Sequence, residues 1–401
     1  MKQMYRFERY LACAGLIAGT LSLWGCGSAS TLDPINTTTT RIVAFGDALV
    51  DVGQEGRLNA ALNKYRYTVN NVVAGTNTGN TFVEYLSSFF GFGSVAYALD
   101  NLAAGRLPST GAYSYGEFGA LVSGTTDARG CTKVVSTLTE RKNGTAVANA
   151  YCAYNLQAQI DLFLAQGSPT STDLFVISIG TGDIMATGIR NLTIDATTPA
   201  TVLAGLAAVQ TDLATAGVST TMQAAANALA VQVKRLTDAG AKYVLIVGPP
   251  NVGRSPWATT TGNATLFQNL SYNTGSGVIS MGSEGLARIQ ATFGNKTNNP
   301  VLFVEISGLV NTLTDGGNTV FANKTSVCTA TAATLTSVTA SSIGTGIAAP
   351  GQLSAALCTT ATLGGDQSTY VYADGVNFTP AMQNQFYSQA LARMRLAAWI
   401  D

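Results

Sequence analysis

The chain lacks histidine entirely and has little charge. None of its 401 residues is histidine, which excludes an imidazole general base and any metal site built on histidine ligands. Charged residues make up only 11% of the chain, against about 25% in a typical soluble domain. Lys and Arg total 22, and Asp and Glu total 22. The sequence therefore has no basic excess of the kind that binds nucleic acid, and we expect no nucleic-acid partner.

What the chain does have is a large apolar fraction, arranged in alternating patterns. Hydrophobic residues make up 46% of the sequence, enough for a substantial core. Four short apolar runs, each followed by a turn signal, predict buried strands at 41–45, 173–179, 242–248 and 301–306. Helical patterns are expected at 81–90, 154–166, 220–239 and 380–400. Strands alternating with helices predict an α/β fold with a doubly wound, mostly parallel sheet flanked by helices.

We expect one folded domain over 41–401, with two loop-rich insertions. The segments at about 106–152 and 310–368 are rich in Thr and Ala and carry no clear periodic pattern. Their surfaces are solvated loops or, alternatively, a face that binds a partner. In a doubly wound fold, functional residues follow the carboxyl ends of the strands, so we look for them there.

The N-terminus has the features of a targeting segment. Lys2, Arg6 and Arg9 precede an apolar stretch over residues 11–24. That stretch is 14 residues long, shorter than the ~20 residues that span a membrane. Residues 1–25 are therefore expected to be a signal peptide, and the protein is expected to be exported.

The end of this segment resembles the lipobox of bacterial lipoproteins. Leu23–Cys26 has the order Leu, variable residue, small residue, Cys. The resemblance implies cleavage after Gly25, lipidation of Cys26 and a flexible tether over 26–40. Gly27 follows, which favours an outer-membrane lipoprotein facing the periplasm or the cell surface. The alternative is an ordinary secretory signal that leaves Cys26 as a free thiol.

Four further cysteines agree with export to an oxidising compartment. Four cysteines allow three pairings. Because Cys131 and Cys152 lie in one insertion and Cys328 and Cys358 in the other, we expect two local disulfides, Cys131–Cys152 and Cys328–Cys358. The cysteine spacing does not match a zinc site, and we expect no cofactor and no metal.

The segment after the first predicted strand resembles the first block of the GDSL (SGNH) ester hydrolases. Phe45–Asp51 reads FGDALVD, which matches the family pattern FGDSLxD everywhere except at the serine. The resemblance implies an SGNH-hydrolase-like, flavodoxin-like three-layer sandwich, with position 48 as the nucleophile. Ala48 has no heteroatom with which to attack an ester carbonyl.

A second block lies before the last predicted helix, where the family carries DxxHPT. Here Asp374 is retained as the residue that would orient the base, and Asn377 stands at the position of the base. An amide does not accept a proton near neutral pH. Asn377 is close to histidine in shape and polarity, and we expect it to keep the local hydrogen bond to Asp374.

Both oxyanion-hole blocks are also altered. Gly180–Asp183 resembles the family's GxND block with Gly182 in place of the asparagine donor. The segment 101–106 resembles the NxAxGG block, where the backbone donor is Gly105 or, in the other register, has become Arg106. Oxyanion donors stabilise the transition state of acyl transfer, so both changes weaken the expected site.

These departures fall on the residues that carry the family's chemistry, whereas its scaffold residues persist. The pattern resembles lipoprotein members of the family from proteobacteria. We therefore expect a catalytically inactive protein that binds an acyl or glycan ester, or a protein partner, through the former active-site cleft. The alternative is an ester hydrolase, a lipase or acylhydrolase, with altered catalytic machinery.

Other chemistry at this sheet edge stays open. Either Asp47, Asp183 and Asp374 converge on a hard cation, or Asp47 and Asp183 accept hydrogen bonds from loop backbones. Thr181 or Thr379 is a candidate substitute nucleophile, although the sequence offers no evident group to activate either. Four tyrosines are candidates either to line a pocket or to pack: Tyr113, Tyr115, Tyr370 and Tyr372.

Overall fold

The computed structural model describes most of the folded part of the chain. The described residues are 38–53, 66–73, 76–77, 79–101, 106–124, 153–190, 217–260, 262, 264–272, 280–294, 299–328, 355 and 358–401. They belong to one compact unit, Pro34–Asp401. The predicted signal peptide, Cys26, Gly105 and the predicted pair Cys131–Cys152 lie outside the described residues.

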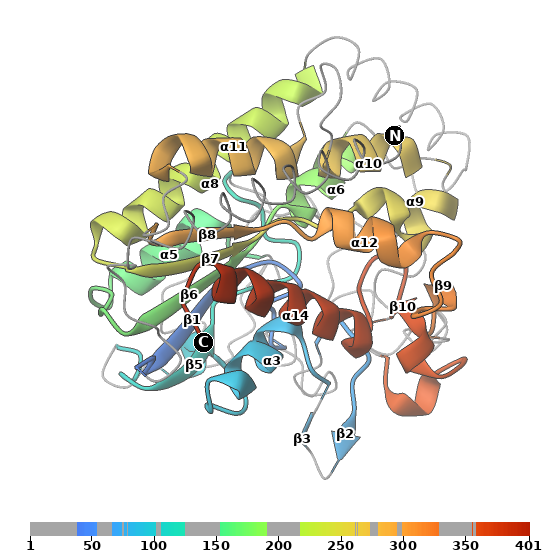
Figure 1. Ribbon diagram of the computed structural model, residues 1–401, viewed down its shortest axis with the longest axis horizontal. Coiled ribbons are helices and arrows are strands. Elements are labelled where there is room, and N and C mark those ends of the chain that lie inside the picture. Colours follow the sequence, from blue (N-terminus) through green and yellow to red (C-terminus); the bar gives the residue numbers. More distant parts are fainter. Residues whose placement is uncertain are drawn as a thin grey trace, which may run out of the picture. The chain divides into compact units, whose positions relative to one another are not determined.

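A parallel sheet of six strands forms the centre of this unit (Figure 1). Its order is β4 (Ala96–Tyr97), β5 (Gly111–Ser114), β1 (Arg41–Gly46), β6 (Asp173–Ser178), β7 (Tyr243–Val247) and β8 (Val301–Val304). All neighbouring pairs in this sheet run parallel. The four strands predicted from apolar runs are β1, β6, β7 and β8, and the α/β class with a mostly parallel sheet is confirmed.

The middle strands are buried on both faces. Every residue of β1, β6 and β7 is buried, which explains why their sequences are continuous apolar runs instead of alternating patterns. At the start of β1, the buried Arg41 guanidinium binds the Asp173 carboxylate of β6, with Nη2 to Oδ2 at 2.6 Å. The two charges that begin these strands therefore neutralise each other inside the fold.

Helices cover both faces of the sheet (Figure 1). On one face, α8 (Gly217–Asp238) packs against α11 (Met281–Phe293) and α5 (Leu156–Leu164). On the other face, α14 (Pro380–Leu396) packs against α3 (Phe82–Phe89). The four predicted helices correspond to α3, α5, α8 and α14.

The remaining described elements have ten residues or fewer. They are β2 (Val72–Val73), β3 (Thr76–Asn77), β9 (Asn323–Ser326), β10 (Tyr370–Tyr372), α6 (Thr181–Arg190), α9 (Pro256–Thr260), α10 (Ala264–Ser271), α12 (Ser307–Thr314), and the 3₁₀ turns η2 (Ala98–Asn101), η3 (Val252–Arg254), η5 (Thr360–Thr362) and η6 (Gln367–Thr369). None of the helices in the described ranges is long and apolar enough to cross a membrane.

The segments that the sequence marked as loop-rich contain regular structure. β5 lies within the expected insertion at 106–152, yet it pairs with β1 from Arg41↔Gly111 to Ala44↔Ser114. In the other insertion, β9 pairs with β10. Both strands were missed because they are only four residues long and carry small and polar residues. Tertiary pairing, not local propensity, selects their extended form.

A disulfide joins Cys328 to Cys358, with Cα atoms 5.7 Å apart. Cys358 is buried in a small cluster with Val69, Val327 and Ala373. Cys328 N–H donates to the Ala373 carbonyl at 3.0 Å. The bridge therefore closes a loop within the second insertion, and the Cys328 backbone bond ties that loop to the chain just before Asp374.

Candidate functional site

A small cavity lies where β1 and β6 end, at the edge where the fold predicts function. Its volume is about 20 Å³, room for roughly one water molecule. Ala48 and Thr181 in its lining are partly exposed, whereas most of the other lining residues are buried. The full lining is Asp47, Ala48, Phe118, Gly119, Thr181, Gly182, Met185, Val376 and Asn377. The cavity thus brings together positions 48, 182 and 377, which the sequence places up to 329 residues apart.

Asp47 is the acidic residue in the cavity wall, and its side chain is almost fully buried. Its Oδ2 accepts a hydrogen bond from Thr181 N–H at 3.2 Å. Within the described part of the chain, Oδ1 has no hydrogen-bond partner. Burial raises the pKa of Asp47 to about 7, although the nearby Leu49, Thr181 and Gly182 amides and the Thr181 hydroxyl act in the opposite direction.

Ala48 presents a methyl group to an aromatic pair. Tyr67 and Phe118 stack with ring centroids 3.9 Å apart, and Ala48 packs against them. The tight turn after β1 is closed by Val50 N–H, which donates to the Asp47 carbonyl at 3.1 Å, and Asp47 N–H joins the turn to the Ser178 carbonyl of β6 at 2.8 Å. The turn that the resemblance predicts is therefore formed, and the side chain that it presents makes an apolar contact.

Asp374 and Asn377 form a closed hydrogen-bonded turn. Asn377 Nδ2 donates to Asp374 Oδ2 at 2.9 Å, which is the hydrogen bond expected from the sequence. The Asp374 carboxylate also accepts from the backbone N–H groups of Val376, Asn377 and Ala355. Burial raises the pKa of Asp374 to about 6. With four donors around it, this carboxylate is fully engaged in holding the turn.

Gly182 is packed against backbone from another loop. A Cβ atom at position 182 would lie 2.3 Å from the Ala120 carbonyl oxygen and 3.2 Å from its carbon. Real Cβ atoms do not approach backbone so closely, so an asparagine side chain cannot be built at 182 without moving the loop. At the expected asparagine position, the neighbouring group is therefore a hydrogen-bond acceptor and not a donor.

The segment that approaches Gly182 is the 116–124 loop, which follows β5. Phe118 N–H donates to Asp51 Oδ2 at 2.7 Å, and Val122 N–H donates to Asp183 Oδ2 at 3.1 Å. Leu156 N–H donates to the Leu121 carbonyl at 2.8 Å. These bonds hold Phe118 and Gly119 in the cavity wall.

The loop's part in the site was missed from the sequence. The resemblance placed the second oxyanion block at 101–106, but Gly105 lies outside the described residues and Arg106 is exposed and absent from the cavity lining. Gly119 lines the cavity with a positive φ of 82°. The available sequence signal for this loop was the spacing of the glycines at 116, 119 and 124. They follow β5, a strand that was not predicted from the sequence.

The three aspartates do not form a metal site. Among the described residues, no group of three His, Cys, Asp or Glu side chains could hold a metal ion. Asp183 uses its carboxylate for the Val122 amide, and Asp374 uses its carboxylate for the turn described above. Asp47 and Asp183 accept hydrogen bonds from loop backbones. This is one of the two interpretations that the sequence left open.

The two candidate threonines differ in their surroundings. Thr379 is fully buried and caps α14: its Oγ1 accepts from Met382 N–H and donates to the Tyr370 carbonyl at 2.7 Å. It has no access to the cavity wall. Thr181 does line the cavity, and its hydroxyl interacts with the Asp47 carboxylate.

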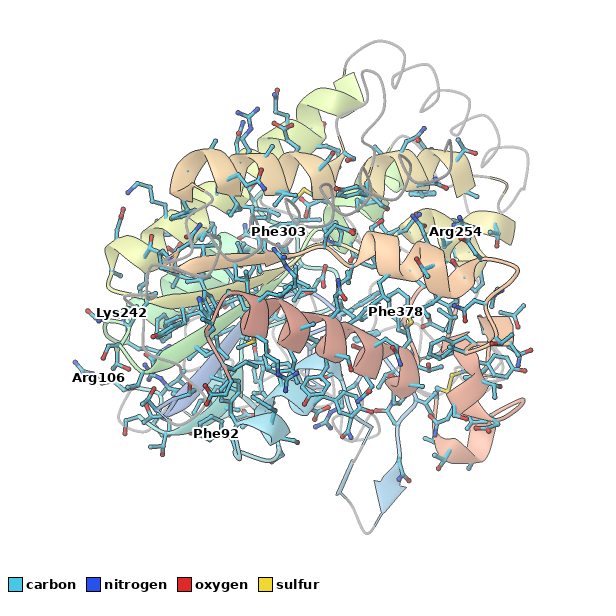
Figure 2. The ribbon with its side chains drawn as sticks, viewed as in Figure 1. Phe92, Arg106, Lys242, Arg254, Phe303 and Phe378 are labelled. Atoms are coloured by element: carbon cyan, nitrogen blue, oxygen red, sulfur yellow. A yellow bond between two sulfur atoms is a disulfide. The ribbon has the colours of Figure 1, made fainter. Side chains whose placement is uncertain are left out.

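The four tyrosines pack elsewhere. Tyr113 donates to the Thr110 carbonyl, and Tyr115 stacks on Phe45 with centroids 5.4 Å apart. Tyr372 stacks on Phe378 at 5.2 Å; Figure 2 shows Phe378 near α14. Tyr370 packs against the cluster around the disulfide. None of the four is in the cavity lining.

No model of a known protein family matches this chain, and no curated protein matches it.

Proposed function

We propose that this protein is a non-catalytic relative of the GDSL (SGNH) ester hydrolases. It binds an acyl ester, a glycan ester or a protein partner at the former active-site cleft. The observation that carries the proposal is the content of the cavity: a methyl group at 48, an amide at 377 and a carbonyl oxygen beside 182. Three positions that would attack, deprotonate and stabilise in an esterase each hold a group that does none of these.

The cavity geometry favours contact at the rim over entry of a substrate. A volume of about 20 Å³ is far below the roughly 300–1,000 Å³ of sites that enclose small molecules. The 116–124 loop is pinned by Asp51 and Asp183, so the wall does not open without breaking buried hydrogen bonds. A ligand or partner therefore touches the exposed parts of Ala48 and Thr181.

A partial restoration tests this proposal. We expect the double variant Ala48→Ser, Asn377→His to remain without turnover of p-nitrophenyl butyrate, because the Ala120 carbonyl still stands beside position 182. The matched control is Asn377→His alone, which measures any damage to the Asp374 turn. Turnover by the double variant that the single variant lacks would show an intact esterase pocket and overturn the proposal of a remodelled site.

A second candidate function is ester hydrolysis by altered machinery, and one observation favours it. Asp47 has an unbonded buried oxygen and a pKa of about 7 beside the Thr181 hydroxyl. A carboxylate with that pKa is suited to act as a general base near neutral pH. This hypothesis requires turnover by the wild-type protein that Asp47→Asn abolishes and that Thr181→Val abolishes as well.

We further propose that the protein is an exported lipoprotein anchored through Cys26. The basic residues, the short apolar stretch and the lipobox-like Leu23–Cys26 support this. Metabolic labelling with a palmitate analogue in a bacterial host tests it. Wild type is expected to carry the label and Cys26→Ser to lose it, while Cys13→Ser serves as the control; equal labelling of wild type and Cys26→Ser would contradict the assignment.

A further inference from the structure

A second hollow lies at the free edge of the sheet, beside β8. Its volume is about 200 Å³, ten times that of the cavity near Ala48. The C-terminal ends of α11 and α14 form its two sides, and β8 lies between them. We call it the β8 groove; its principal lining residues are Leu286, Ile289, Leu302, Phe303, Arg393 and Leu396.

The apolar wall of the groove comes from both faces of the sheet. Phe303 points toward α11, where a Cβ on Gly285 would lie 3.8 Å from its ring (Figure 2). Leu302, the residue before it in the strand, faces the opposite way. Leu396, on α14, is 78% exposed, the highest value among the exposed large hydrophobic residues in the described ranges. An exposed apolar side chain beside an open groove is typical of a binding surface.

β8 also offers unused backbone groups. Among the described strands it is the last of the sheet and pairs with β7 alone. Val244 N–H donates to the Pro300 carbonyl and Gly248 N–H to the Val304 carbonyl. Even-numbered residues of β8 thus face β7. Alternate peptide groups point to opposite sides of a strand, so Val301 and Phe303 direct theirs to the open edge.

One of these edge groups, the Val301 N–H, already has a hydrogen-bond partner. Val301 N–H donates to Asn299 Oδ1 at 2.9 Å. This leaves the Val301 carbonyl and the Phe303 N–H and carbonyl at the open edge. One residue of an added parallel strand would pair with the Val301 carbonyl and the Phe303 N–H, and one residue of an antiparallel strand with the Phe303 N–H and carbonyl. Such unpaired edge groups are where an extended peptide adds to a sheet.

Among the described residues that line the groove, Arg393 is the one cation. Arg393 is exposed on the last turn of α14, and within the described part of the chain its guanidinium makes no ion pair. The neighbouring Arg395 donates to the Asp401 carbonyl, so it is oriented away by its own contact. Arg393 is therefore available to an acidic group on whatever occupies the groove.

We propose that the β8 groove binds an extended peptide segment of a partner protein by strand addition. The segment carries apolar side chains at alternate positions and an acidic residue at one end. The backbone of the peptide pairs with Val301 and Phe303, an apolar side chain fills the space beside Phe303 and Leu396, and the acidic residue binds Arg393. This site is separate from the cavity near Ala48, and the proposal does not depend on the function assigned to that cavity.

A pair of synthetic peptides tests strand addition directly. The first is acetyl-Asp-Thr-Leu-Thr-Leu-Thr-amide; the second has the same side chains with every peptide nitrogen methylated, so neither of its edges can donate to a strand. Binding to the full chain is measured by isothermal titration calorimetry and by hydrogen exchange. We expect saturable binding of the first peptide only, with slowed exchange over Val301–Val304.

Two variants with matched controls locate the site. Arg393→Glu is expected to weaken binding about tenfold or more by reversing the charge at the rim, whereas Arg106→Glu, an exposed cation outside the groove, leaves binding unchanged. Leu396→Lys is expected to abolish binding, and Val231→Lys, an equally simple surface change on α8, is not. All four positions are exposed, so the variants are expected to fold.

Several results would overturn the proposal. Equal binding of both peptides would show apolar contact without strand pairing. Absence of saturable binding at millimolar peptide would remove the site. Binding of sodium octanoate with no binding of peptide would assign the groove to an acyl chain. A dimer that Arg393→Glu dissolves, again with no peptide binding, would assign it to a second copy of this chain.

Discussion

Position 182 shows how one residue is determined by the loop that packs against it. By comparison with the GxND block alone, Gly182 is the loss of an amide donor, which substitution by asparagine would restore. In the structure, the glycine is required because the Ala120 carbonyl occupies the space next to its Cα. The glycine and the 116–124 loop therefore depend on each other for their packing. At position 48 the same holds on a smaller scale, since the methyl group packs on Tyr67 and Phe118.

Gly182→Ala is expected to destabilise the protein by about 1–3 kcal/mol, the usual cost of forcing an atom into a packed interior. This would occur despite the better helix propensity of alanine within α6. The comparison is Gly316→Ala, where an added Cβ meets nothing within 4 Å. Urea unfolding of both variants and wild type measures the difference, and equal stability of the two variants would show that the 116–124 loop yields easily.

Asp47 makes stability depend on pH in a defined direction. Its pKa is raised from 3.8 to about 7 in the folded protein, so the folded state holds this proton more tightly than the unfolded state. The raised pKa therefore stabilises the folded state fully below about pH 4. This stabilisation is lost as pH rises through about 7, and the free energy of unfolding falls by no more than about 1.4 kcal/mol per pH unit.

Asp47→Asn removes this titration and keeps the shape of the side chain. We expect the variant to gain stability relative to wild type as pH rises from 4 to 8, measured by urea unfolding at several pH values. Asp374 titrates in the same direction, with a pKa raised to about 6, and it remains in both proteins. A difference between variant and wild type that stays constant with pH would contradict the raised pKa of Asp47.

At the scale of elements, the second insertion supports the turn that carries Asp374. The Cys328–Cys358 bridge, the Cys328 bond to Ala373 and the Ala355 bond to Asp374 connect one buried cluster to that turn. The insertion is thus part of the scaffold at this edge of the sheet. The insertion shows no hydrophobic period in the sequence. A cross-link stabilises it, and a cross-link leaves no such period.

Removal of this bridge is expected to lower the free energy of unfolding by roughly 3 kcal/mol, the usual chain-entropy effect for a loop of this size. The bonded cysteines are 30 residues apart. The variant is Cys328→Ala, Cys358→Ala, and its unfolding in urea is compared with that of oxidised wild type. The control adds reductant to the variant itself, which reports any contribution from other thiols. An unchanged unfolding midpoint in the variant would mean that the insertion is held by its packing alone.

For the whole molecule, the sequence predicted the frame of the fold more completely than the site. Long apolar runs identified β1, β6, β7 and β8, because strands buried on both faces must be apolar throughout. The same reasoning could not find β5, whose four residues owe their form to pairing with β1. The motifs led to Ala48 and Asn377, which line one cavity, and to Asp374, which accepts a hydrogen bond from Asn377. They did not lead to the 116–124 loop, because its role depends on contacts with Asp51, Gly182 and Asp183 that are distant in the sequence.

Ester hydrolysis by the purified wild-type protein tests the central claim most directly. The measurement is release of p-nitrophenol from p-nitrophenyl butyrate between pH 5 and 9, with Asp47→Asn and Asp374→Ala measured alongside. We predict that all three proteins match the rate in buffer at every pH, because no group in the cavity attacks the ester. A wild-type rate above buffer that either substitution abolishes would contradict this account and establish the protein as a hydrolase.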